Sequence, residues 1–281
     1  MKQIIFLFLS AISFIGYSQS DLKFDKRFVQ CENKWVAFKP DSTNVYNFGF
    51  IYIDAQAGLT LDYAGTFTID DKGKFITKKI EQTGSMKYRL QPNNVLVAII
   101  PETKFTDLEI LTVPDWLKHY KGDENSIERL YRWGYLYNGW NECSKALEYL
   151  TKAEKIDPNY KGLSVELAFS YNCLQQYDDA IKVLQKALKA NDKDAYTVKE
   201  YIYALTKKEK FEEAKEYYRK SLKTVPDKTY QAEIAYNILQ GYFLKKDVKK
   251  FDEWLKESET IITSNPQFKN FVEQMKTEIK K

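Results

Sequence analysis

The side chains in this sequence that could do chemistry point to binding rather than to catalysis. His119 is the only histidine among 281 residues, so a histidine-based triad would have to use a residue from a charged segment. Acidic pairs such as Asp70-Asp71 and Glu212-Glu213 stand at expected turns or helix starts, where carboxylates favour the helix dipole. The sequence has no zinc-type Cys/His spacing, no glycine-rich phosphate loop and no GxSxG element. We therefore expect no enzyme and no cofactor.

Large and small apolar residues recur with a spacing of 34 between Ile127 and Pro226. Trp133-Gly134-x-x-Tyr137 returns as Leu167-Ala168-x-x-Tyr171 and then as Tyr201-Ile202-x-x-Leu205, and small residues follow at matching places, Ala146, Ala180 and Ala214. Small residues let paired helices approach closely, and large ones fill the gap between repeats. This period and pattern resemble the tetratricopeptide repeat family, which implies a solenoid of stacked helical hairpins.

The resemblance covers about 127–281. It implies three repeats at 127–160, 161–194 and 195–228, whose second helices begin near Cys143, Tyr177 and Phe211. A fourth, degenerate repeat at 232–265 requires an insertion of about three residues. Residues 267–281 are then expected to form a capping helix, because a solenoid needs a polar end to close its core.

The resemblance also implies that the first helix of each repeat lines a groove for a peptide or a partner helix. Carrying the family's groove positions over repeat by repeat gives Tyr131, Tyr135, Asn138, Phe169, Asn172, Tyr196, Lys199, Tyr203, Tyr236 and Gln240. Aromatic rings give a large contact area at low entropic cost, and amides can bind a peptide backbone. The alternative is that some of these aromatic residues belong to the core between repeats or are covered by the N-terminal domain.

Three cysteines, Cys31, Cys143 and Cys173, allow one disulfide and one leftover thiol, or no disulfide at all. In stacked hairpins Cys143 would open the second helix of repeat one, and Cys173 would close the first helix of repeat two. These ends lie at the same edge, so a Cys143–Cys173 disulfide is geometrically feasible. It would stabilise the fold by about 3–4 kcal/mol. The alternative is that both cysteines are small core residues.

Between Val29 and Val113 the apolar pattern changes to period two, which predicts strands. Leu59, Leu61, Tyr63, Phe67 and Ile69 are expected to share one strand face, with Gly65 as a bend or bulge. Further strands are expected near 34–38, 48–53, 74–77, 86–90, 95–100 and 105–113. The fold class is therefore multidomain α+β, with a small antiparallel β sandwich or roll followed by the all-α solenoid.

The domain plan is a β-rich domain at 21–114, a joint at 115–126, and the repeats at 127–266. In the joint, Trp116 and Tyr120 are expected to pack against the first repeat helix. Residues 1–20 carry one lysine, an apolar run from Ile4 to Gly16 and small residues at the end, which indicates a cleavable secretory signal. The run is too short to span a bilayer comfortably, and we expect no transmembrane segment. The mature protein is expected to be exported, in the periplasm or outside the cell.

The 43 basic and 39 acidic residues give a net charge of +4, which does not indicate a nucleic-acid partner. The leading hypothesis is an exported scaffold that binds a protein or peptide in a bacterial envelope. One alternative is a carbohydrate-binding protein in which Trp35, Tyr46, Tyr52 or Tyr63 stacks on a glycan. A second alternative is an accessory subunit of an outer-membrane machine.

Overall fold

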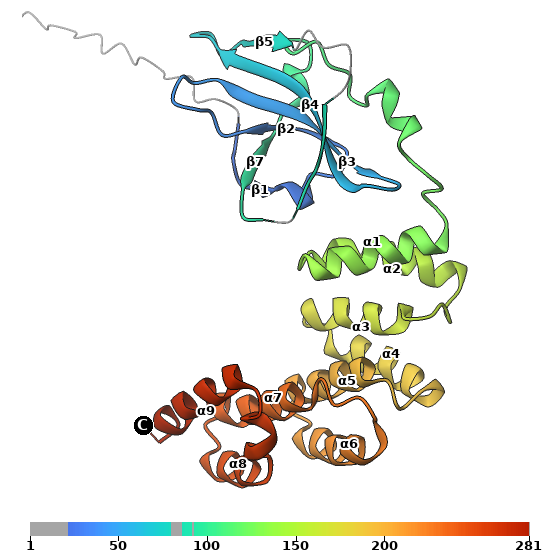
Figure 1. Ribbon diagram of the computed structural model, residues 1–281, viewed down its shortest axis with the longest axis vertical. Coiled ribbons are helices and arrows are strands. Elements are labelled where there is room, and N and C mark those ends of the chain that lie inside the picture. Colours follow the sequence, from blue (N-terminus) through green and yellow to red (C-terminus); the bar gives the residue numbers. More distant parts are fainter. Residues whose placement is uncertain (1–21, 80–85, 92, 281) are drawn as a thin grey trace, which may run out of the picture. The chain divides into compact units, whose positions relative to one another are not determined.

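The computed structural model describes residues 22–79, 86–91 and 93–280, and it divides the chain into two compact units (Figure 1). The first unit ends at Gly122 and contains the strands, and the second begins at Asp123 and contains the α-helices. The expected signal segment, residues 1–20, lies outside the described residues. Within the described ranges, no helix has the length and apolar character required to cross a membrane.

The strands of the first unit form one antiparallel sheet with the order β1-β7-β2-β3-β4-β5, and β6 pairs with the same strand, β4, as β5 does. Their bounds are β1 Lys26–Arg27, β2 Lys34–Phe38, β3 Tyr46–Asp54, β4 Gly58–Ile69, β5 Phe75–Lys79, β6 Met86–Arg89 and β7 Leu96–Ile99. The long central strands β3 and β4 carry the aromatic residues that fill the core, including Phe48, Phe50, Tyr52 and Phe67.

A bulge in β4 changes which residues share a face. Phe48 pairs with Gly65 while its neighbour Gly49 pairs with Tyr63, so Ala64 is the extra residue. The expected irregularity at Gly65 is therefore confirmed. The expected single face is wrong, however, because the extra residue reverses the alternation beyond it. A Cβ on Gly49 would overlap the carbonyl oxygen of Asp62, so this crossing of the two strands requires glycine.

The segment 105–113, which we expected to be a strand, is instead a series of turns that follows a 3₁₀ helix at Glu102–Lys104. Its apolar residue Leu108 is fully buried in the sheet core, and the indole of Trp35 donates to the carbonyl oxygen of Leu111 at 2.8 Å. Phe105, Leu108 and Ile110 therefore pack on one face of the sheet, and the segment adds no strand to it.

Trp116 and Tyr120 also belong to the β unit. Trp116 lies in a short 3₁₀ helix, Asp115–His119, and Tyr120 follows it; both rings meet Tyr52 edge to face, with centroids 5.2 and 5.9 Å away. The ammonium group of Lys87 lies 4.1 Å from the centroid of the Trp116 ring and 2.6 Å from Asp62 Oδ1. Both rings therefore pack on the aromatic core of the sheet, within the first unit.

The second unit is a series of antiparallel helix pairs. The helices are α1 Ile127–Gly139, α2 Cys143–Ile156, α3 Leu163–Cys173, α4 Tyr177–Ala190, α5 Ala195–Lys207, α6 Phe211–Thr224, α7 Gln231–Leu244, α8 Val248–Ile262 and α9 Pro266–Glu278. The second helices of the first three pairs begin at Cys143, Tyr177 and Phe211, as the period of 34 predicted. A short loop joins each pair to the next, so the period of 34 is the length of one hairpin with its connecting loop.

Small residues allow the helices of a pair to approach. Ala146, Ala180 and Ala214 are fully buried at matching places in α2, α4 and α6. In α1, a Cβ on Gly134 would overlap the side chain of Leu150 in α2, so glycine is required at this contact. The first helices α1, α3, α5 and α7 pack next to one another in turn, and they form a continuous face of the unit.

Candidate functional site

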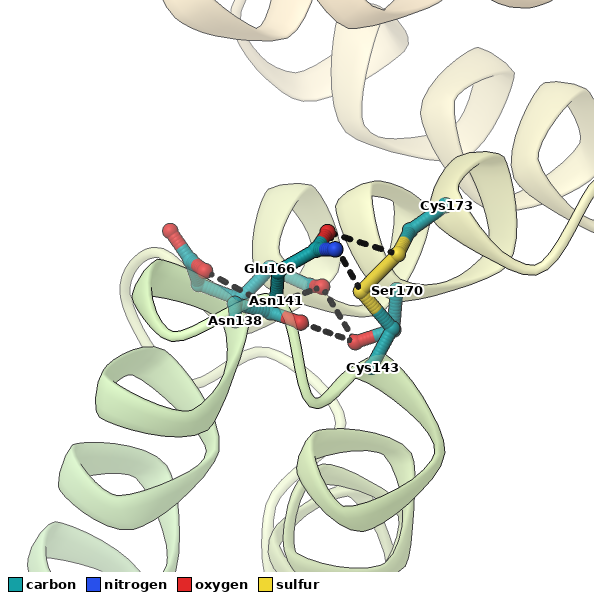
Figure 2. Close-up of a disulfide and its surroundings, with 6 residues drawn as sticks. All are labelled: Asn138, Asn141, Cys143, Glu166, Ser170 and Cys173. Carbon is teal, nitrogen blue, oxygen red and sulfur yellow. Dashed lines mark hydrogen bonds between the residues drawn. A yellow bond between two sulfur atoms is a disulfide. The ribbon is translucent and has the colours of Figure 1, made fainter. Parts of the chain in front are cut away.

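Three polar side chains are buried together at the contact between α1 and α3, which we call the first junction. Asn138 Nδ2 donates to the Glu166 carbonyl oxygen and to Glu166 Oε2, both at 2.9 Å, and Ser170 Oγ donates to Asn138 Oδ1 at 2.7 Å (Figure 2). Asn138 and Glu166 are each 3% exposed, and Ser170 is fully buried. Both ends of the Asn138 amide are therefore satisfied, and repeat one is held in register with repeat two.

A disulfide joins Cys143 of α2 to Cys173 of α3 at the same junction (Figure 2). The side chain of Asn141 lies against it, with its Oδ1 atom 3.5 Å from the sulfur of Cys173. The sequence allowed two interpretations, a disulfide between these cysteines or two small core residues, and the structure shows the disulfide. Cys31, the remaining cysteine, is fully buried in the β unit, where burial raises the pKa of its thiol to about 12.

The contact between α3 and α5, the second junction, repeats part of this arrangement 34 residues later. Asn172 Nδ2 donates to the carbonyl oxygen of Glu200 at 3.2 Å and to Glu200 Oε2 at 2.8 Å. The residue that corresponds to Ser170 is Ala204, which has no hydroxyl group. Asn172 Oδ1 is accordingly a buried acceptor to which none of the residues that the structure describes donates a hydrogen bond. The same pair therefore recurs with one hydrogen bond fewer.

Asn138 and Asn172 were expected in the groove. This expectation is wrong for Asn138, whereas Asn172 lines a hollow beside the second junction. They are 3% and 4% exposed, and their amides are engaged by the glutamates of the following repeat. The glutamates themselves were missed. A signal was present in the sequence, since Glu166 and Glu200 recur with the period of 34 at positions where the surrounding helix is apolar.

The charge of the two glutamates is balanced differently. Lys199 Nζ lies 2.9 Å from Glu200 Oε1 and 3.7 Å from Glu233 Oε1. Burial acts to lower the pKa of Lys199, but the two carboxylates outweigh it and the pKa is raised. The residue that corresponds to Lys199 at the first junction is Val165. Across the described residues, Glu166 forms no ion pair, and burial raises its pKa despite the hydrogen bond from Asn138.

A hollow of about 880 Å³ opens beside the first junction, and we call it the tyrosine hollow. Five tyrosines and the carboxylate of Glu166 line it: Tyr131 and Tyr135 from α1, Tyr160 from the loop before α3, Tyr196 from α5, and Tyr230 from the residue before α7. Burial, and then the neighbouring charge of Glu166, raises the pKa of Tyr131 to about 12. Three of the expected groove residues, Tyr131, Tyr135 and Tyr196, meet here.

A second hollow of about 490 Å³, the lysine hollow, lies beside the second junction. Phe169, Lys199 and Tyr203, all half-buried, line it together with Glu200 and Glu233. These three residues were also expected in the groove. Asn172 lines the lysine hollow as well, so the two hollows gather seven of the ten expected residues on the face made by α1, α3 and α5.

The far end of this face is covered by the chain itself. Tyr236 of α7 is 9% exposed and stacks on Phe268 of α9, with ring centroids 4.7 Å apart. Gln240 is half-buried and donates to the Tyr236 hydroxyl at 3.4 Å. The expectation that Tyr236 contacts a partner is therefore wrong, because the capping helix occupies its position. Gln240 lies beside it, outside both hollows.

The aromatic residues proposed as a glycan platform are largely inside the β unit. Trp35 is 6% exposed and Tyr52 is fully buried, so neither presents a ring to solvent. Tyr46 is half-buried and stacks on Phe67 with centroids 4.9 Å apart, and the hydroxyl group of Tyr63 donates to Asn47 at 2.7 Å. Trp35, Tyr46 and Tyr52 belong to the sheet core, and the expectation of stacking by Trp35 and Tyr52 is wrong.

Comparison with known families agrees with the repeat period. Two family models, both described as tetratricopeptide repeat, match residues 143–199 and 203–227. Residues 143–227 are tetratricopeptide repeats. The matched stretch begins at the first residue of α2 and ends just after α6. It contains most of the residues that line the two hollows, and Tyr131, Tyr135 and Tyr230 of the tyrosine hollow lie outside it. Scaffolds of this kind bind other proteins and are generally not enzymes.

Solved structures with partial similarity include two bacterial proteins. Pseudomonas aeruginosa PilF is 14% identical over 54% of this chain and 68% of its own, with a TM-score of 0.39. MamA from Desulfovibrio magneticus RS-1 is 20% identical over 54% of this chain and 82% of its own, with a TM-score of 0.43. No curated protein matches the chain.

Proposed function

We propose that this protein is exported and that its tetratricopeptide unit docks a protein or peptide partner in a bacterial envelope. The observation that carries the proposal is the pair of hollows on the face of α1, α3 and α5, where exposed and half-buried aromatic rings stand beside buried charges. Tyr135 is 54% exposed although it lies among four other tyrosines, and such clusters of amphipathic rings are enriched at protein interfaces.

Two observations support export. Residues 1–20 have the charge, apolar run and small-residue end of a secretory signal. The Cys143–Cys173 disulfide is of a kind that persists in oxidising compartments and is rare in reducing ones. Fractionation of cells, combined with alkylation of free thiols, tests this part. We expect the chain in the exported fraction with one free thiol, and a variant without residues 1–20 inside the cell with three. The full chain retained in the cytosol with three free thiols would overturn it.

Crosslinking in living cells followed by purification of the chain tests the docking face. The double variant Tyr135→Ala/Phe169→Ala removes one ring from each hollow, and it is expected to lose a crosslinked protein that the wild type captures. The matched control is Ile156→Ala on α2, because Ile156 is as exposed as Tyr135, at 53%, but lies outside both hollows. A band that survives in the double variant and disappears in the control would place the docking surface elsewhere.

A further inference from the structure

Each junction contains a buried glutamate at the same repeat position. Glu200 at the second junction pairs with a lysine of this chain, whereas Glu166 at the first junction forms no ion pair with any described residue. At the second junction, Lys199 fills the space beside Glu200, with its ammonium 2.9 Å from Oε1 and over the rings of Tyr196 and Tyr230, whose centroids are 4.8 and 5.1 Å away. A carboxylate and two ring faces thus surround one ammonium group. This combination is a cation site, because carboxylate charge and ring quadrupoles both attract a positive group.

The first junction has the same elements but no lysine. Glu166 corresponds to Glu200, and it is 3% exposed, yet it lines the tyrosine hollow. Val165 stands in the place of Lys199, and Gly162 stands in the place of Tyr196. A Cβ on Gly162 would overlap the hydroxyl group of Tyr131, so the ring of Tyr131 occupies the space that the second junction gives to Tyr196.

The tyrosine hollow therefore offers a carboxylate and several aromatic rings around a volume of about 880 Å³. We propose that this hollow binds a lysine or arginine side chain of the partner protein, which pairs with Glu166 as Lys199 pairs with Glu200. The proposal names the chemistry of the partner's anchor, and in this respect it rests on the proposed docking function. Burial of Glu166 without an ion-pair partner costs free energy, and a basic side chain from a partner offsets part of that cost through charge-assisted hydrogen bonds.

Two lysines, Lys161 and Lys186, and one aspartate, Asp194, also line the hollow. All three are exposed residues, and their charges are screened by water and salt. Lys199 acts on the pKa of Glu166 at longer range, but its ion pairs are with Glu200 and Glu233. Glu166 is the charge at the buried side of the hollow, and it is the group that an entering ammonium would reach out of contact with bulk water.

The test uses the full chain and a defined probe, Nα-acetyl-lysine methylamide, titrated in NMR experiments that follow the backbone amides. The neutral counterpart contains norleucine, which keeps the aliphatic chain and lacks the ammonium. We expect the lysine probe to bind at the tyrosine hollow with a Kd of about 1–10 mM and the norleucine probe at least about tenfold more weakly. Equal affinity for the two probes would overturn the proposal.

Two variants locate the site and assign the charge. Glu166→Gln keeps an acceptor for Asn138 and removes the charge, so it is expected to weaken the binding of the lysine probe about tenfold. Val165→Lys supplies the cation from within, as Lys199 does in the next repeat, and is expected to cause a similar loss. Val165→Met is the matched control, since it adds a long neutral side chain at the same place. Binding by Val165→Lys as strong as that of the wild type, or an equal loss in Val165→Met, would contradict the assignment.

The outcome is separable from that of the docking experiment. A crosslinked partner whose capture is unchanged in Val165→Lys and Glu166→Gln would leave the docking function standing and remove the basic anchor. Binding of the lysine probe without any crosslinked partner would establish the cation site and count against the docking function. Unchanged circular dichroism spectra of both variants serve as the check that the helical unit remains folded.

Discussion

The first and second junctions use the same Asn–Glu pair, and each stabilises it with different groups. At the first, Ser170 completes the hydrogen bonds of Asn138 and a disulfide ties the hairpins together, while Glu166 forms no ion pair with any described residue. At the second, Lys199 pairs with Glu200, but no described residue donates a hydrogen bond to Asn172 Oδ1. The comparison shows that a repeat conserves its helix packing more strictly than its polar contacts, because the period constrains backbone spacing and leaves single side chains free to change.

The disulfide, which only the first junction contains, is expected to make the largest difference to the free energy of unfolding. Reduction, or the variant Cys143→Ala/Cys173→Ala, should lower the free energy of unfolding of the helical unit by about 3–4 kcal/mol, since the bond closes a loop in the unfolded chain. Urea unfolding followed by far-UV circular dichroism, which mainly reports helices, measures this loss. A change of less than about 1 kcal/mol would mean that the bond adds little to a junction already held by packing.

The next largest difference is expected between the stability losses caused by replacing Asn138 and by replacing Asn172. Asn138→Ala removes the donor to a glutamate that has no cation, and we expect a loss of about 2–4 kcal/mol. Asn172→Ala leaves Glu200 paired with Lys199 and removes an acceptor that was already unsatisfied, so we expect about 1–2 kcal/mol. The same urea experiment ranks the two. An equal or reversed order would show that the lysine does not compensate for the amide.

Exchanging one hydroxyl group between the junctions should give a smaller and opposite pair of effects. Ser170→Ala leaves Asn138 Oδ1 without its donor and should cost about 1–2 kcal/mol. Ala204→Ser supplies the donor that Asn172 Oδ1 lacks and should stabilise by about 0.5–1.5 kcal/mol. Thermal unfolding is sensitive enough to detect both. If Ala204→Ser destabilises the unit, the fully buried site has no room for the hydroxyl group.

The smallest expected difference is in how the stability of the helical unit depends on pH. Burial raises the pKa of Glu166 above its unfolded value, so the folded state holds this proton more tightly. The stabilisation is complete below the unfolded pKa, and it is lost as the pH rises through the folded pKa. Glu166→Gln should therefore gain stability relative to the wild type as the pH rises from acid to neutral. Glu200→Gln should instead destabilise at neutral pH, because it removes the nearest partner of Lys199. Parallel stability curves for Glu166→Gln and the wild type would contradict this sign.

The repeat part was predictable because its signal is local and repeated. Ala146, Ala180 and Ala214 are fully buried where the period placed them, and the second helices begin at the expected residues. Seven of the expected residues line the two hollows, because each repeat turns the same positions of its first helix to the same face. Asn138 was misplaced, since a position on a helix face does not reveal whether a glutamate from the next repeat covers it.

The β unit was harder to predict for a physical reason that is visible in β4. Its alternation indicated one apolar face, but the extra residue Ala64 reverses the pattern, so Phe67 lies on the same face as Thr60 and Asp62. The apolar residues of 105–113 gave no sign that they cover the sheet instead of joining it. Register and coverage in a sheet depend on partners distant in sequence, which alternation alone does not identify.

The sequence by itself determined the hairpin period, the helix starts and the types of residue that line the two hollows, because these depend on contacts within one repeat or between adjacent ones. Only the tertiary structure decided that Asn138 and Asn172 are buried, that α9 covers Tyr236, and that Glu166 lines a hollow with five tyrosines and forms no ion pair with any described residue. These outcomes follow from side chains contributed by separate repeats, whose burial and charge balance exist only when the helices are packed together.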